Sequence, residues 1–152
     1  MCGSVVERYV DIVMNLEKVF KNKKVIVTGH TGFKGSWLTL WLTEIGANVL
    51  GISKNIPTKP SHYELLDLGK KIKSKKIDIQ NLNKLKRIIK KFKPDFIFHL
   101  AAQSIVRKSY TKTIETWKTN LMGTVNILES LKENKKETIT IIITSDKCYK
   151  NI

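Results

Sequence analysis

Three regularly spaced glycines carry the clearest chemical signal in the sequence. Gly29, Gly32 and Gly35 lie three residues apart in the segment Thr-Gly-His-Thr-Gly-Phe-Lys-Gly, residues 28–35. Glycine tolerates unusual backbone angles and has no side chain, so an anion can approach the main chain closely at such a turn. Gly29 would allow the sharp turn, Gly32 the close approach, and Gly35 tight packing of the following helix on a sheet.

The chemistry predicted for this turn is anion binding by main-chain amides. The amides of residues 32–34 would stand at the start of a helix, where the positive end of the helix dipole favours negative charge. A glycine triplet alone is weak evidence, but this one lies where an apolar strand, 25–27, meets a helix predicted from Phe33 to Ile45 and ending at Gly46. This setting favours a dinucleotide diphosphate over an ordinary glycine-rich loop.

Alternating strand and helix patterns predict the frame that positions the turn. We predict strands at 48–52, just before Asp78, at 96–100 and at 139–143, and helices at 63–68, 82–92 and 113–133. Because each strand is a nearly continuous apolar run, both faces of the sheet should be covered by helices. The expected fold class is α/β, a Rossmann-type doubly wound parallel sheet of about five strands in the order 3-2-1-4-5.

The length of 152 residues favours a single domain. Residues 23–152 would form an NAD(P)-binding domain. Residues 1–22 carry no recognisable chemistry, and we interpret them as a leader of unknown role outside the fold. Met14 could itself be a start residue.

The net charge of +15 is large, but the lysines are spread along the whole chain. The densest run, Lys84 to Lys93, alternates with apolar residues at helical spacing, which is typical of the solvated face of an amphipathic helix. No aromatic interleaving or known reading-head motif accompanies the charge, so nucleic-acid binding is the least favoured of the functions considered.

The remaining compositional features argue against a membrane protein and a metal site. No apolar run approaches the roughly 20 residues that a membrane helix needs, and the first residues lack the pattern of a secretory signal, which favours the cytoplasm. Cys2 and Cys148 fit neither a metal-binding spacing nor a disulfide framework, so we interpret both as free thiols.

Three large side chains near the predicted turn are expected to pack rather than react. Trp37 and Trp41 lie one helical turn apart and should pack against the sheet. His99 should be a packed histidine at the end of a strand rather than an acid or a base.

The spacing G-x-x-G-x-x-G resembles that of the short-chain dehydrogenase/reductase family, in particular its extended branch. Asp78-Ile79 is similar to the segment that holds the adenine ring in this family, and residues 94–103 resemble its fourth strand, where small alanines let the cofactor pass. Asn120 matches a helix asparagine of the family. The resemblance implies that the cofactor-binding residues are Gly29, Thr31, Gly32, Phe33, Lys34, Gly35, Ser53, Asp78, Ile79, Leu100, Ala101, Ala102, Gln103, Asn120 and Thr144.

Residues 29–38, 102–110 and 144–149 further resemble the CDP-glucose 4,6-dehydratases, a subgroup of the same branch. The resemblance implies an internal redox reaction on CDP-glucose. Hydride passes from C4 of the sugar to bound NAD, water leaves across C5 and C6, and the hydride returns to C6. The product would be CDP-4-keto-6-deoxyglucose, an intermediate of nucleotide-sugar metabolism.

The same resemblance implies roles for individual side chains. Ser145 would hydrogen-bond the sugar O4, and Asp146 would protonate the departing C6 hydroxyl. Lys147 would occupy the place of the base that removes the C5 proton, which requires a lowered pKa. Ser104 and Arg107 would contact the substrate.

The choice of dinucleotide is left open by the residues after the second predicted strand. Ser53-Lys54 occurs where dinucleotide-binding folds usually place an acid that binds the ribose hydroxyls. A lysine could favour a 2′-phosphate and therefore NADP, whereas the family resemblance favours NAD.

The resemblance also implies that the sequence covers only the front part of such an enzyme. Family members take their proton at C4 through a Tyr-x-x-x-Lys pair expected well beyond Asp146, and no tyrosine of this sequence has a lysine four places later. We therefore expect a fold that stops before the last strands and the substrate domain, and no dehydratase turnover from this chain alone. Homodimers in the family commonly form through the helix predicted at 113–133.

Two alternatives stay open at this point. The chain could belong to another nucleotide-sugar epimerase or dehydratase. It could also be a non-catalytic, dinucleotide-sensing module that keeps the fold without the catalytic tyrosine.

Overall fold

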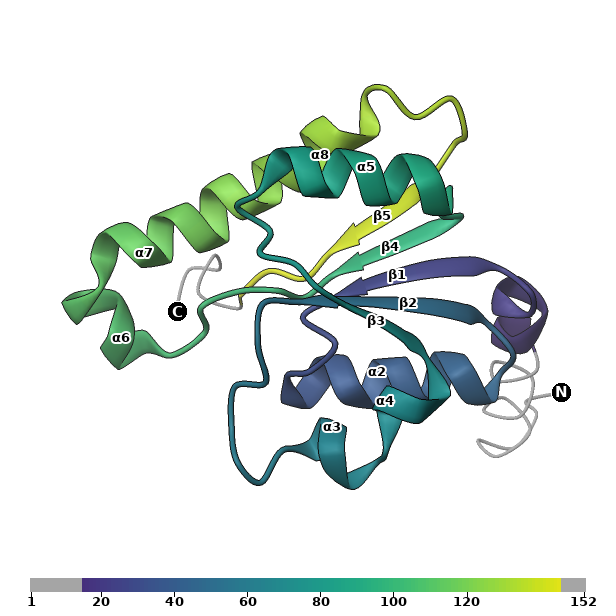
Figure 1. Cartoon of the computed structure of the whole chain (residues 1–152), viewed down its shortest axis with the longest axis horizontal. Coiled ribbons are helices and arrows are strands. Elements are labelled where there is room, and N and C mark those ends of the chain that lie inside the picture. The colour runs from purple at the N-terminus through teal and green to yellow at the C-terminus, as the bar shows by residue number, and fades with distance from the viewer. Residues whose placement is uncertain (1–14, 146–152) are drawn as a thin grey trace, which may run out of the picture.

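Five parallel strands form the centre of the structure, a computed structural model that describes residues 15–145. They lie side by side in the order β3-β2-β1-β4-β5, and the four neighbouring pairs are all parallel (Figure 1). The predicted fold class and strand order are confirmed. The strands are β1 (Lys24–Thr28), β2 (Asn48–Ser53), β3 (Lys73–Lys76), β4 (Phe96–His99) and β5 (Ile139–Ile142).

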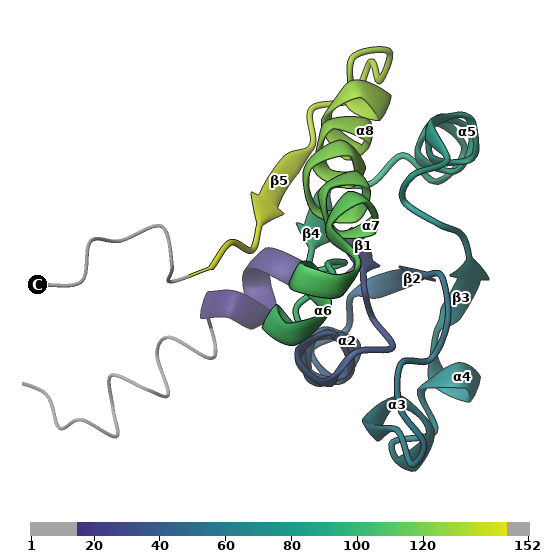
Figure 2. The ribbon, with the colours of Figure 1, turned by 90° about the vertical axis from the view of Figure 1, so that its left-hand side faces the viewer.

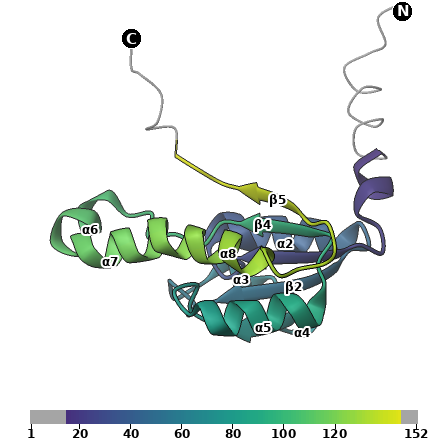
Figure 3. The same cartoon turned by 90° about the horizontal axis from the view of Figure 1, so that it is seen from above.

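Helices cover both faces of the sheet. Figure 2 views the molecule along the strands and shows α2, α3 and α4 on one side and α5 and α8 on the other. The segment with α6 and α7 extends beyond the carboxyl ends of the strands (Figures 1 and 3). The helices are α2 (Phe33–Glu44), α3 (His62–Leu65), α4 (Leu68–Lys71), α5 (Leu82–Phe92), α6 (Val106–Thr111), α7 (Thr113–Trp117), the π-helical η1 (Lys118–Met122) and α8 (Gly123–Leu131).

Successive residues of the central strands face two separate apolar cores. Along β1, Val25 and Val27 belong to the core on the α2 side, whereas Ile26 belongs to the core under α5 and α8. A central strand buried on both faces must be apolar throughout, as β1 is. The core under α5 and α8 contains Ile26, Leu50, Ile52, Ile79, Leu85, Ile89, Ile97 and Ile127, and the other contains Phe20, Val25, Val27, Leu42 and Val49.

Helix α5 has the predicted bounds, because its signals are local. The Asn81 side chain accepts a hydrogen bond from the Lys84 N–H and caps the start, and Lys93 ends the helix in the left-handed conformation before Pro94. Leu85 and Ile89 are buried, while the lysines of this helix lie on its outer side, as expected for a solvated face.

The edge strand β3 differs from the expectation of apolar strands. Its four residues, Lys-Ser-Lys-Lys, are all exposed, and it pairs on one side only, with β2. Charged side chains on an edge strand oppose pairing with a further chain, so the sequence of β3 suits its place in the sheet.

The helix predicted at 113–133 is interrupted, and its apolar stripe is exposed. The π-helical segment η1 separates α7 from α8, and the segment ends at Leu131. The stripe residues lie 42–72% exposed, because α7 extends past the sheet and α8 buries Gly123, Ile127 and Ser130 instead. The exposed stripe consists of Ile114, Trp117, Leu121, Val125 and Leu128.

Part of the segment that sequence analysis left outside the fold packs against the sheet. Residues 15–20 are helical, and Phe20 is buried in the core on the α2 side. Its ring lies 4.9 Å from that of Phe96, 5.9 Å from Phe98 and 6.2 Å from Trp41. The apolar residues of 6–20 recur every three or four positions, but this helical spacing does not show which part of the fold Phe20 contacts. Within the described residues 15–145, no helix has the length and apolar character needed to cross a membrane.

Replacing Phe20 by alanine should lower the free energy of unfolding by about 3 kcal/mol, because it opens a cavity against three aromatic rings. Val19→Ala, at an exposed position of the same helix, is the control and should cost less than about 1 kcal/mol. Urea denaturation followed by circular dichroism measures both. Equal small losses in the two variants would show that residues 15–20 add nothing to the stability of the domain.

Candidate functional site

The glycine turn lies at the carboxyl end of β1, pressed between neighbouring segments. Gly29 has a φ of +76°, which favours glycine, and a methyl group there would lie 2.8 Å from the Ala101 nitrogen. The Gly29 N–H donates to the Ile52 carbonyl at 2.8 Å, and the Gly32 N–H donates to the Gly29 carbonyl at 3.0 Å. The main chain is therefore fixed from three sides.

The start of α2 is built for an anion. A methyl group at Gly35 would lie 2.1 Å from the Gly29 oxygen, so only glycine lets the helix begin this close to the turn. No side chain among the described residues caps this end of α2, and its first turn contains no acidic residue. The first amides of the helix, with the helix dipole behind them, are therefore available to an anionic group. Phe33 and Lys34 lie exposed beside them.

Side chains of the turn bind it to the ends of β2 and β3. The Thr31 hydroxyl donates to the Asn55 carbonyl at 2.7 Å, and the Thr31 N–H donates to Ser53 Oγ at 3.4 Å. His30, which is 1% exposed, lies with Nδ1 2.9 Å from Ser53 Oγ and Nε2 2.8 Å from Ser74 Oγ. Burial lowers the pKa of His30, so its ring is neutral near pH 7.

No sequence pattern predicted the role of His30. The residue stands between two glycines of the turn, but its partner Ser74 is 44 positions away on β3. Only the pairing of β3 with β2 brings Ser74 beneath the turn, and no local pattern encodes that contact.

The segment after β4 forms the second wall of the site. The Ala101 N–H donates to Thr28 Oγ1 at 3.2 Å. Asn120, in η1, holds the main chain of Gln103 with both ends of its amide: its Oδ1 accepts from the Gln103 N–H at 2.7 Å and its Nδ2 donates to the Gln103 carbonyl at 3.0 Å. Asn120 thus fixes the course of residues 100–103, which lie across from the turn.

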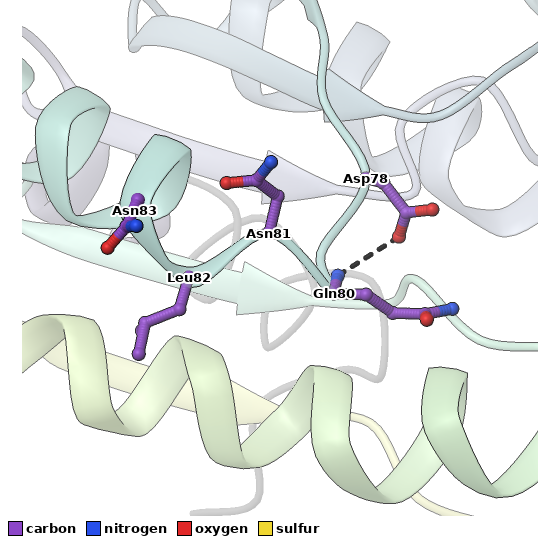
Figure 4. Close-up of a pocket in the computed structure, with 5 residues that line it drawn as sticks. All are labelled: Asp78, Gln80, Asn81, Leu82 and Asn83. Carbon is purple, nitrogen blue, oxygen red and sulfur yellow. Dashed lines mark hydrogen bonds between the residues drawn. The ribbon is translucent and has the colours of Figure 1, made fainter.

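A third part of the site follows β3. Asp78, Gln80, Asn81, Leu82 and Asn83 line an open hollow of about 540 Å³ (Figure 4). The Asp78 carboxylate accepts from the Gln80 N–H at 3.0 Å and lies 3.0 Å from the Lys54 ammonium.

Ile79 supports this segment from inside. Its side chain is buried against Gly123 of α8, and its carbonyl accepts from Asn126 Nδ2 at 3.0 Å. The side chain of this predicted cofactor-binding residue therefore belongs to the core.

The parallel sheet brings the remaining predicted residues to the same edge, because β1, β4 and β5 end side by side (Figure 1). Ser104 and Arg107 lie exposed before and within α6, and Thr144 and Ser145 follow β5. Asp146 and Lys147 lie outside the described residues. Among residues 15–145 there is no group of three His, Cys, Asp or Glu side chains that could hold a metal ion.

The two tryptophans behave differently from one another. Trp41 packs against the core on the α2 side, as predicted. The prediction for Trp37 is wrong: its side chain is 50% exposed, and its ring lies 4.5 Å from His62. Helical spacing cannot show that position 37 faces α3 rather than the sheet.

His99 is packed, as predicted. It is 3% exposed at the end of β4, with Nδ1 2.7 Å from Thr28 Oγ1 and Nε2 3.0 Å from Thr124 Oγ1. Burial lowers the pKa of His99 to about 4. The neutral ring joins the end of β1, through Thr28, to α8.

Strand order, helix layers and the glycine turn define a Rossmann-type domain like those of the short-chain dehydrogenases and reductases. More particularly, a model of the GDP-mannose 4,6 dehydratase family matches residues 26–151, and the chain belongs to this family. It is 51% identical to a CDP-glucose 4,6-dehydratase of Salmonella typhimurium, over 87% of this chain and 37% of that protein.

Solved structures agree with this assignment. An epimerase of Methanothermobacter thermautotrophicus superimposes with a TM-score of 0.76 at 29% identity, over 89% of this chain and 39% of that one. A UDP-glucose 4-epimerase of Thermus thermophilus in complex with NAD gives 0.65 at 26% identity, over 75% of this chain and 35% of that one. The chain thus spans under half the length of these relatives, and it corresponds to their N-terminal part.

The buried His99 makes folding stability depend on pH. The unfolded chain takes up a proton near pH 6.5, whereas the folded ring does so only near pH 4. Its contribution is therefore complete above pH 6.5 and is lost progressively as the pH falls to about 4, for a total of about 3 kcal/mol. Urea denaturation from pH 7.5 to 4 should show this decline in the parent chain and a shallower one in His99→Gln, with His30 responsible for part of the remainder. If the free energy of unfolding fell equally steeply with pH in the parent chain and in His99→Gln, the decline would not come from His99.

Proposed function

We propose that this chain is the NAD-binding part of a 4,6-dehydratase that acts on CDP-glucose. The observation that carries the proposal is the glycine turn at the start of α2. The first amides of this helix have no side-chain cap, and Gly35 lies so close to the Gly29 main chain that no larger residue fits there. This cradle fits a dinucleotide diphosphate. The 51% identity to a CDP-glucose 4,6-dehydratase supports the choice of reaction and nucleotide.

We propose that three segments at the carboxyl edge of the sheet bind different parts of the dinucleotide. The amides at the start of α2 hold the diphosphate, the segment after β3 receives the adenosine end, and residues 100–103 lie along the path toward the sugar. Bound NAD would supply a hydride acceptor for C4 of the sugar. Asn120 keeps residues 100–103 in place through its two hydrogen bonds to Gln103.

The residues after β5 would contact the sugar. We propose that Ser145 hydrogen-bonds O4, that Asp146 delivers a proton to the departing C6 hydroxyl, and that Lys147 occupies the position of the base at C5. Ser104 and Arg107 are the proposed contacts with the rest of the substrate. Ser104, Arg107 and Ser145 lie at or beyond the carboxyl ends of β4 and β5, where ligands of open α/β sheets bind.

We further propose that the stripe from Ile114 to Leu128 is a homodimer surface. Large apolar side chains exposed along one helical segment are the usual mark of a protein contact.

Isothermal titration calorimetry and an activity assay test the proposal together. The 152-residue chain should release heat on binding NAD. It should leave CDP-glucose unchanged when the nucleotide sugars are separated by chromatography, because no Tyr-x-x-x-Lys pair occurs in it. Absence of dinucleotide binding by a folded sample would refute the proposed function. Formation of a 4-keto-6-deoxy sugar by this chain would refute only the expectation of inactivity.

Gly35→Ala should weaken NAD binding at least about tenfold, because the added methyl group would force the Gly29 carbonyl out of place. Gly69→Ala is the control, since its methyl group in α4 would approach only the end of the Tyr63 side chain, with the hydroxyl at 3.2 Å. Titration calorimetry gives both dissociation constants, and circular dichroism checks the fold. Equal affinity for NAD in the two variants would show that NAD binding does not depend on the glycine turn.

A further inference from the structure

Lys54 directly follows β2 and is held beside the glycine turn through both of its neighbours. Ser53 Oγ accepts from the Thr31 N–H, and the Asn55 carbonyl accepts from the Thr31 hydroxyl. A dinucleotide whose diphosphate rests on the turn places its adenosine ribose at the end of β2. Lys54 is therefore near the 2′ position of that ribose, where NADP carries a phosphate and NAD a hydroxyl.

The Lys54 ammonium is already engaged by a carboxylate. Its Nζ lies 3.0 Å from Asp78 Oδ2. The hydrogen bond and charge of Asp78 raise the pKa of Lys54, and the charge of Glu115 on α7 acts in the same direction. Asp78 thus neutralises the Lys54 ammonium beside the ribose position, whereas Glu115 is itself paired with Lys112 at 3.7 Å.

Asp78 is the fixed member of the pair. Its side chain is 30% exposed against 61% for Lys54, and its other oxygen accepts from the Gln80 N–H at 3.0 Å (Figure 4). Burial opposes ionisation of Asp78, but the Gln80 amide and Lys54 outweigh it and lower its pKa. Asp78 is therefore charged at neutral pH.

The two members respond differently to a ligand. An ion pair this exposed contributes little, about 0–1 kcal/mol, so Lys54 can swing away at small cost. Asp78 would stay. A 2′-phosphate, with a charge of about −1.5 to −2, would then meet an adjacent carboxylate. A 2′-hydroxyl meets no repulsion and can donate a hydrogen bond to a carboxylate.

We propose that Asp78 makes this site selective for NAD over NADP by masking Lys54 and repelling a 2′-phosphate. The inference rests on the proposed function, and it reverses the reading of Lys54 as a phosphate-binding residue. Asp78 is the specificity-determining residue of the pair, and Lys54 is a cation that becomes available only when that carboxylate is removed.

Calorimetric titration of the 152-residue chain with NAD and with NADP tests the proposal. The parent chain should bind NAD at least about tenfold more tightly than NADP. Asp78→Asn keeps an acceptor for the Gln80 N–H but loses the charge, and it should tighten NADP binding about tenfold relative to NAD binding. The double variant Asp78→Asn, Lys54→Gln should lose most of that gain, because the gain depends on the released ammonium.

Three results would overturn the proposal: a parent chain that prefers NADP, an unchanged NAD to NADP ratio in folded Asp78→Asn, or a gain that persists in the double variant. Asp78→Ser, which can also accept from Gln80, replaces Asp78→Asn if that variant does not fold. A folded parent chain that binds neither dinucleotide would instead refute the proposed function, so the two failures are distinguishable.

Discussion

The contact between two main-chain segments at Gly29 and Gly35 is the constraint on which the rest of the site depends. The Gly29 carbonyl fills the space that a side chain at Gly35 would need, and Gly29 itself lies against residues 100–101. A side chain at Gly35 would push α2 away from β1, and a side chain at Gly29 would collide with the segment after β4. Because the helix can start so close to the strand, its first amides and the ends of β2 and β4 face one small region. Anion binding is then a property of the backbone, and the surrounding side chains serve to hold that backbone still.

Much of the fold could be predicted because its signals are local. The glycine spacing gave the first crossover, and the apolar residues at helical spacing within the lysine-rich run 84–93 gave α5. Elements that depend on distant contacts were harder. The stripe from Ile114 to Leu128 has helical spacing, but spacing does not say whether a partner surface exists, and α7 extends past the sheet. Phe20 joins the core through Phe96 and Phe98 of β4, contacts that the helical spacing of the residues before it could not identify.

The positions of the candidate site could be predicted from the sequence. Fewer of the hydrogen bonds that hold these positions in place could be predicted. Parallel strands end at one edge, so the residues after β1, β2, β4 and β5 had to converge there. The polar contacts beneath them depend on register: His30 meets Ser74 only because β3 pairs with β2 as it does. Buried polar groups of this kind are costly when unpaired and rigid when paired, so they stabilise the turn that they support. Lys54 shows the same limit. From the sequence alone it could bind a 2′-phosphate, whereas in the structure its ammonium is paired with Asp78.

The central claim, that the first amides of α2 bind a dinucleotide diphosphate, can be tested amide by amide. Two-dimensional 1H–15N NMR of the 152-residue chain during titration with NAD reports each main-chain N–H separately. The account predicts that the largest shifts occur at residues 32–35, with smaller shifts at residues 78–80 and 101–103. Saturating shifts confined to other parts of the chain, with the amides of 32–35 unmoved, would contradict it.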